Sequence, residues 1–384
     1  VARVMAGDYE AGVGNTAYVT LSDAIKAAPN GGTVQILKNI ELEETLNIDK
    51  SLTLTSHEGV YTVTRSDKLL NGYMLNVTGG NLTIENVIFD GGADWTGDDA
   101  RLNRGTLNSG LIAERPIASV SSGVLNMEEG SVFENNHNSS GYSNAGGAAA
   151  VNTGGVLKLN GGIIRNNSCD SYGGALILQN SGEFYMEQGS VTGNFAGNSG
   201  GAICADHSSK VNVEGGTFSN NATNTAGGAI WFSNGTGVLK GEFTDNYANN
   251  GALVYINGSA KVSLEGGNYK GNTASRGQSI YFGNGTLNIG NVESFGDTIN
   301  LPTGKIFNIT ADISGRSIKV VPVADLADMT KIANVSSEEF AKRARVAINI
   351  DGYALYAEGK EIYANTPKEN DINGDGIVNA ADAA

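Results

Sequence analysis

The chain has 384 residues, of which 40 % are hydrophobic and 17 % are charged, and its formal net charge is −15. This length and apolar content are sufficient for a large buried core. The negative charge argues against nucleic acid or an anionic membrane as a partner, because both require a basic surface. No run of about 18 apolar residues occurs, which predicts that no helix spans a membrane. Residues 1–3 show no signal peptide, as expected of a cytosolic protein or of a mature secreted protein after signal removal.

The first structural signal is a helix near the N-terminus. Residues 20–32 form a short amphipathic segment with Thr20 or Ser22 as its N-cap, and Pro29 and a glycine pair end it. From Thr33 to Phe89, short runs of alternating apolar residues predict strands. We expect the helix to cover the open end of the structure that these strands build, since an uncovered end exposes core and unpaired strand edges.

Residues 90–116 interrupt the strands with a polar stretch that is too long for a turn. Long loops on a regular scaffold often hold functional groups. Both a calcium-dependent lyase and a glycosidase require clustered carboxylates, and the lyase also requires a basic residue beside them. The candidates are Asp94, Asp98, Asp99, Arg101 and Arg104, with Asp90 beside them and Trp95 as a candidate ligand-binding residue. The alternative is an exposed loop with internal ion pairs.

From about residue 125 to 289 the sequence repeats. Gly-Gly-Ala recurs from Gly146 with a spacing of 27 residues, and weaker copies follow at Gly251 and Gly277. An apolar residue stands three places before an asparagine in each repeat. These pairs are Phe133/Asn136, Ile164/Asn167, Val191/Asn194, Phe218/Asn221, Phe243/Asn246 and Tyr269/Asn272. A third phrase in most of the repeats is a short run of alternating apolar residues, such as Val211 and Val213.

This period predicts a solenoid. The apolar residues are two apart, so the units are strands with alternate side chains inward, and no segment is long enough for a crossover helix. Each strand then stacks in parallel on its counterpart one turn later, about 4.8 Å away. We therefore predict an all-β fold, a right-handed parallel β-helix with three faces. The asparagines should stack into a ladder at one corner, where their amides both donate and accept hydrogen bonds.

Beyond Phe295 the pattern changes to strands with one short helix near 336–343, which predicts a β-rich C-terminal cap. Residues 366–370 form a linker. The predicted organisation is an N-terminal segment with its helix (1–32), the β-helix (33–294), the C-terminal cap (295–365) and a linker with a tail (366–384).

The tail has oxygen-bearing side chains at the spacing of an EF-hand-type calcium loop. Asp371, Asn373, Asp375, Asn379 and Asp382 occupy loop positions 1, 3, 5, 9 and 12, Gly376 allows the sharp turn at position 6, and Ile377 would donate its backbone carbonyl. These residues predict Ca²⁺ binding. The loop resembles the first calcium loop of a type I dockerin, and the resemblance implies a cohesin domain of a scaffold protein as the partner of the full-length form. The alternative is an unrelated tail rich in Asp, Asn and Gly.

The repeats, with Gly-Gly-Ala-Ile and Phe-x-x-Asn, resemble polymorphic-membrane-protein-like repeats of the pectin-lyase-like superfamily over residues 20–290. That superfamily contains polysaccharide lyases and glycosidases beside non-catalytic adhesins, so the resemblance does not settle the chemistry. No His-Gly motif of an inverting polygalacturonase occurs, and His57, His137 and His207 are each expected at the surface. Carboxylate columns running from coil to coil are not expected in the array.

A predicted outward column is apolar and aromatic. If Leu176, Ile203, Ile230, Leu253 and Ile280 point inward, the residues after them point outward: Ile177, Cys204, Trp231, Val254 and Tyr281, with Ala150 before them. Trp231 and Tyr281 are therefore candidate ligand-binding residues, since aromatic rings stack on sugar rings. A loop could instead cover the column, or it could face inward. Cys169 and Cys204 fall in different columns, which argues against a disulfide bond.

Together with the dockerin resemblance, these features predict a secreted or extracellular protein, on the cell surface or in a cellulosome-like assembly, that is a polysaccharide-binding or adhesive module. An enzyme of the same fold, a polysaccharide lyase or glycoside hydrolase acting on plant or host glycans, is the alternative. A purely structural spacer is the third interpretation.

Overall fold

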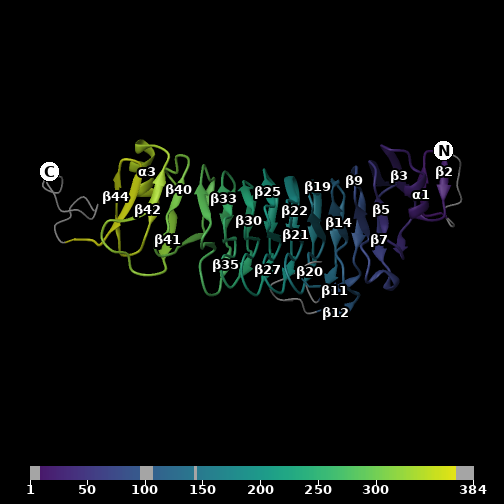
Figure 1. Ribbon diagram of the computed structural model, residues 1–384, viewed down its shortest axis with the longest axis horizontal. Helices are drawn as coiled ribbons and strands as arrows, with labels where there is room; N and C mark the ends of the chain where they lie inside the picture. Colours follow the sequence, from purple (N-terminus) through teal and green to yellow (C-terminus); the bar gives the residue numbers. More distant parts are fainter. Residues whose placement is uncertain (1–8, 96–106, 142–144, 369–384) are drawn as a thin grey trace.

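The computed structural model describes residues 9–95, 107–141 and 145–368 and confirms the predicted fold class. The chain forms a right-handed type of β-solenoid with about 11 turns. Figure 1 shows the coils side by side along the long axis of the molecule, from the N-terminal helix to the C-terminal cap. Neighbouring coils pair in parallel throughout the array.

Face 1 of the solenoid and face 2 belong to one continuous sheet, because the long strands β19 and β22 run through both. Face 1 contains β3 (Gly32–Ile36), β6 (Leu52–Ser56), β9 (Asn81–Glu85), β15 (Val124–Glu128), β19 (Val156–Arg165), β22 (Glu183–Thr192), β25 (Lys210–Val213), β29 (Thr236–Leu239), β33 (Lys261–Leu264), β37 (Thr286–Ile289), β40 (Phe307–Ile309) and β42 (Thr330–Val335). Face 2 adds β4 (Ile40–Leu42), β7 (Tyr61–Arg65), β10 (Val87–Asp90), β16 (Val132–Glu134), β26 (Thr217–Ser219), β30 (Glu242–Thr244), β34 (Asn268–Lys270) and β38 (Ser294–Phe295).

Face 3 is a separate sheet of twelve short parallel strands. It contains β5 (Leu46–Ile48), β8 (Leu75–Val77), β14 (Ala118–Ser121), β18 (Ala149–Asn152), β21 (Leu176–Leu178), β24 (Ile203–Ala205), β28 (Ile230–Phe232), β32 (Val254–Ile256), β36 (Ile280–Phe282), β39 (Thr298–Leu301), β41 (Ile318–Pro322) and β43 (Ile348–Asn349). A narrow corner sheet lies between faces 2 and 3 along the chain and contains β13 (Ile112–Ala113), β17 (His137–Asn138), β20 (Ser168–Cys169), β23 (Phe195–Ala196), β27 (Ala222–Thr223), β31 (Tyr247–Ala248) and β35 (Thr273–Ala274).

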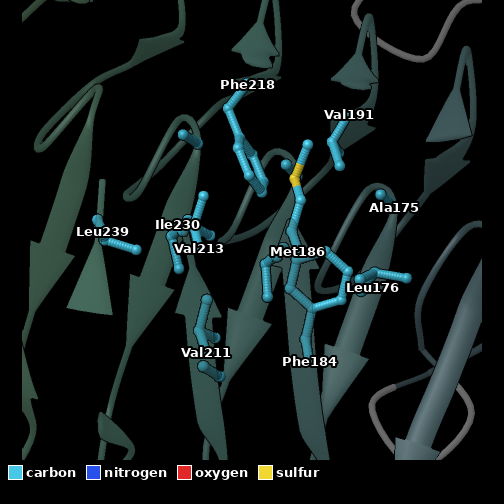
Figure 2. Close-up of a cluster of buried hydrophobic side chains, with 14 of the residues drawn as sticks. Ala175, Leu176, Phe184, Met186, Val191, Val211, Val213, Phe218, Ile230 and Leu239 are labelled. Atoms are coloured by element: carbon cyan, nitrogen blue, oxygen red, sulfur yellow. The ribbon is translucent and has the colours of Figure 1, made fainter. Parts of the chain in front are cut away.

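The core is the interior of the coil, where alternate side chains of all three faces meet. Figure 2 shows one section of it, with Phe184, Met186 and Phe218 among the buried side chains. Phenylalanines stack from coil to coil, and the ring centroids of Phe218 and Phe243 lie 4.8 Å apart. This spacing follows from the distance between parallel strands, so burial and ring stacking reinforce the same register.

The predicted asparagine ladder forms at the corner after face 2. In each rung the Oδ1 atom accepts from the backbone N–H of the asparagine one coil earlier. For Asn167 and Asn194 this distance is 3.0 Å, and Asn167 Nδ2 also donates to the same oxygen. The ladder contains Asn136, Asn167, Asn194, Asn221, Asn246 and Asn272 and ends on Asp297. Buried corner N–H groups thus have partners that the sheets do not supply.

Both ends of the array are covered. Helix α1 (Leu21–Ala27) has Thr20 as its N-cap, with Thr20 Oγ1 accepting from the Asp23 N–H at 3.1 Å, and it buries Leu21 and Ile25 in the core. An antiparallel hairpin of β1 (Ala11–Val13) and β2 (Thr16–Tyr18) extends face 1 beside it. At the other end lie α3 (Glu338–Ala347), β44 (Ala354–Glu358) and β45 (Glu361–Asn365). Because β44 and β45 pair antiparallel, the parallel stacking ends there.

Candidate functional site

The predicted outward column lies on face 3, and the strand register shows its members. They are Ser119, Ala150, Ile177, Cys204, Trp231, Tyr255, Tyr281 and Asn300. One expected member was wrong. Val254 pairs with Ile230 and is buried in the core, so Tyr255 takes the outward position. The coil that ends in β32 is shorter than those before it, which moves the register by one residue relative to the Gly-Ala signal.

The first half of the column is covered. Ala150, Ile177 and Cys204 are buried in a small cluster outside face 3, together with Ala145 and Cys169, and Tyr172 and Trp231 pack against it. Corner residues thus cover this half of the column. Coverage of the column by a loop was one of the alternatives that the sequence left open. Cys169 and Cys204 are both free. Burial raises the pKa of the Cys169 thiol to about 11, which makes it an apolar filler rather than a nucleophile.

The second half of the column reaches the surface as half-buried aromatic rings. Trp231 packs on Tyr172 with ring centroids 6.0 Å apart and an interplanar angle of 41°. Tyr255 and Tyr281 are stacked at 4.6 Å and 7°. Because the two tyrosines cover part of each other's faces, they offer ring edges and hydroxyl groups, and the indole of Trp231 is the larger apolar surface. We call Trp231, Tyr255 and Tyr281 the aromatic column.

A polar network borders the aromatic column on the side where the strands of face 3 end. Asp206 follows β24, and its Oδ1 accepts from the His207 N–H at 2.7 Å and from Asn234 Nδ2 at 3.3 Å. Asn234 Oδ1 in turn accepts from the Ser259 hydroxyl at 3.2 Å. The network therefore links turns of three successive coils. On the other side, the backbone at Gly227 lies so close to the column that an added Cβ would be 2.7 Å from Trp231 Cβ.

Charge is distributed unevenly between the faces. Among the twelve strands of face 3, Lys319 in β41 is the single Asp, Glu, Lys or Arg. Faces 1 and 2 carry ion pairs between neighbouring coils, such as Lys240–Glu214 at 2.6 Å and Lys210–Glu183 at 3.9 Å. The aromatic column thus lies on an uncharged face of a strongly acidic protein.

The structure describes little of the predicted catalytic loop. Asp94 is exposed on β11 (Ala93–Trp95), which pairs antiparallel with β12 (Leu107–Gly110) in a separate two-stranded sheet. The backbone of Trp95 belongs to this sheet and not to face 3. Asp98, Asp99, Arg101 and Arg104 lie outside the described residues, as does the calcium loop of Asp371 to Asp382. Within the described ranges, no group of three or more His, Cys, Asp and Glu side chains could hold a metal ion.

Where the irregular coils meet the regular array, two carboxylates are neighbours between coils on face 2. Asp90 and Glu134 are register partners on β10 and β16, and Arg165 follows on β19. Arg165 Nε donates to Glu134 Oε2 at 2.6 Å. Burial, with a smaller contribution from Glu134, raises the pKa of Asp90. This arrangement could have been found, because each of the three residues directly follows an aligned apolar residue, Phe89, Phe133 or Ile164.

The prediction for His137 was also wrong. His137 is only 7 % exposed, whereas His57 and His207 are exposed as expected. Its Nδ1 lies 2.7 Å from Ser168 Oγ and its Nε2 lies 3.6 Å from Asp170 Oδ1. The three side chains have the composition of a hydrolase triad, but Ser168 is 2 % exposed, so a substrate carbonyl could not reach its oxygen. The contact fixes the corner between β17 and β20.

No protein-family model, curated protein or solved structure matches this chain. Among the described helices, none is both long and apolar enough to cross a membrane.

Proposed function

We propose that the protein binds polysaccharide through the aromatic column of face 3. The observation that supports this proposal best is the set of half-buried aromatic rings beside a hydrogen-bonding network, on strands that carry no charged side chains. Sugars present C–H faces and a belt of hydroxyl groups, and they suit an aromatic surface flanked by amide and carboxylate groups. Trp231 would supply the apolar contact, and Tyr255 and Tyr281 would supply hydroxyl groups.

The test is affinity electrophoresis in gels that contain polysaccharide. Retention of the protein should fall in Trp231→Ala and, less strongly, in Tyr281→Ala. Tyr185→Ala is the matched control, because Tyr185 is also a half-buried tyrosine but lies on face 1 beside Lys210. Equal retention of all three variants and the unchanged protein would contradict the proposal.

We further propose that the C-terminal tail attaches this binding module to a larger assembly. The dockerin-like loop of Asp371, Asn373, Asp375, Ile377, Asn379 and Asp382 supports a secreted, cellulosome-like component that a cohesin would hold in the presence of Ca²⁺. Calorimetric titration with Ca²⁺ should show a binding heat that is lost when residues 371–384 are deleted. The same heat in the deleted form would place calcium elsewhere in the chain.

A glycoside hydrolase or polysaccharide lyase is the second candidate, and the carboxylate pair on face 2 favours it. Asp90, with its raised pKa, could act as a general acid, and Glu134 accepts a hydrogen bond from Arg165 Nε at 2.6 Å. New reducing ends, or unsaturated products that absorb in the ultraviolet, should then appear from a glycan panel and disappear in Asp90→Asn. Retention without any product would leave the protein as a binding module.

A further inference from the structure

The charge distribution around the aromatic column carries information about the class of glycan. From β14 to β39, which is the part of face 3 that contains the column, no strand has a charged side chain. The turns that follow these strands contribute Asp206, which is 7 % exposed and whose Oδ2 lies 3.0 Å from His207 Nδ1. The turns after β28 and β32 contribute the amides and hydroxyls of Ser233, Asn234, Asn257 and Ser259, and the exposed Arg276 lies on the corner before β36.

An acidic polysaccharide, such as a polymer of uronic acids, would meet two obstacles on this face. Each carboxylate would need a cationic partner or several donors, because an unpaired charge next to a half-buried apolar surface loses hydration without compensation. No strand from β14 to β39 supplies a cation, and Asp206 is itself an acidic group. The net charge of −15 adds long-range repulsion against any polyanion.

The shape of the site indicates how a chain would lie. Trp231, Tyr255 and Tyr281 are register partners on β28, β32 and β36, so they follow one another along the axis of the solenoid. Asp206, Asn234 and Ser259 run parallel to them through successive turns. Because strands stack at about 4.8 Å per coil, both rows repeat at a spacing comparable with the length of one sugar unit. Both rows are present in the coils of β28 and β32, where an extended chain along the axis would meet Trp231 with Asn234 and Tyr255 with Ser259.

We infer that the aromatic column selects a neutral, extended polysaccharide lying along the solenoid axis and rejects polyuronates. This inference rests on the proposed function and narrows its ligand. The hydroxyl groups of such a chain need donors and acceptors but no counter-charge, which is what tyrosine hydroxyls and amide side chains provide. Binding of a neutral chain should also be nearly independent of salt, because no ion pairs form.

The experiment compares two sets of probes in affinity electrophoresis and calorimetry. The neutral set is hydroxyethylcellulose, xyloglucan and galactomannan, and the acidic set is polygalacturonate and alginate. We expect retention by at least one neutral polymer, with a Kd that does not change between low salt and roughly 1 M salt. Trp231→Ala should weaken this binding by about tenfold or more. Tyr281→Phe, which keeps the ring, isolates the hydroxyl and should have a smaller effect.

The possible outcomes distinguish failure of the glycan selectivity from failure of the proposed function. Preferential retention by the acidic polymers that is lost in Trp231→Ala would overturn the inference and leave the proposed function standing. Retention by no polymer would refute both. If Trp231→Ala does not fold, as judged by its circular dichroism and thermal transition, Tyr281→Phe together with salt dependence in the unchanged protein decides the question, and Tyr185→Ala remains the control.

Discussion

Replacing Asp297 by asparagine should stabilise the protein at neutral pH. Asp297 ends the asparagine ladder, is 4 % exposed, and accepts from the backbone N–H of Asn272 at 3.2 Å and from Asn272 Nδ2 at 2.5 Å. In the other rungs an amide oxygen accepts both of these bonds. Asparagine at position 297 would keep the acceptor and remove a buried negative charge.

The magnitude follows from the titration of this carboxyl. Burial raises the pKa of Asp297 from its usual value of 3.8 to about 6. Between these values the folded protein keeps a proton that the unfolded chain has lost, so stability falls as pH rises from about 4 to about 6. The difference of about two pH units corresponds to a cost of about 3 kcal/mol above pH 6. Asp297→Asn should recover up to this amount at pH 7.5 and almost none near pH 4.

Denaturant unfolding at several pH values measures this difference. Hydrogen exchange of peptides from 268 to 300 reports on the same site locally, which is needed because repeat arrays do not always unfold in one step. Asp325→Asn is the control, since it removes the same charge from an exposed side chain that does not contribute to the pKa of Asp297. A variant at position 297 that is less stable at pH 7.5, or whose advantage persists unchanged at pH 4, would refute the reasoning.

Three further substitutions test the packing of the solenoid. Arg65→Lys should cost about 3 kcal/mol and expose amides of residues 66–72 to exchange, because one ammonium group cannot replace a buried guanidinium that donates to four backbone carbonyls. Asn194→Ala should cost about 3 kcal/mol in a thermal or denaturant transition, since it leaves the buried Asn167 N–H without its acceptor. Gly201→Ala should cost about 1–3 kcal/mol, because the new Cβ would collide with the Gly228 carbonyl, whereas the same change at Gly141, which has open space, should be nearly neutral.

The spacing of the repeats predicted the fold because a parallel solenoid transfers a sequence period directly into a spatial one. Each Asn of the Phe-x-x-Asn phrase lies on the ladder, and the Gly-Gly corner forms where the next coil leaves no room for a Cβ. The short hairpin of β1 and β2 was not predicted. Its residues, from Ala11 to Tyr18, have no repeat partner, and two three-residue strands are too short to show a period.

The candidate site was less predictable than the fold, for two physical reasons. The alternation of apolar residues predicted the outward column. In the shortened coil, however, Tyr255 and not Val254 takes the outward position. A local sequence pattern cannot show at which residue a shorter coil shifts its register. The burial of Ile177 and Cys204 depends on Tyr172, which lies on a preceding corner and has no periodic signal. His137 was expected outside because its neighbours are polar, yet the corner sheet buries those polar neighbours too.

The irregular coils also explain where a function can arise on a solenoid whose interior is so uniform. Inward positions are held constant because every coil must fill the same cross-section at the same packing density. Outward positions are free of that constraint, and the column changes from small covered residues at Ala150 to half-buried aromatic rings at Trp231 and beyond. The corner cluster of Tyr172 and Cys169 ends at Trp231, so Trp231 is both the last residue packed on that cluster and the first ring of the aromatic column. Its substitution should therefore affect glycan binding and the stability of the adjacent corner together, whereas Tyr281→Phe should affect binding alone.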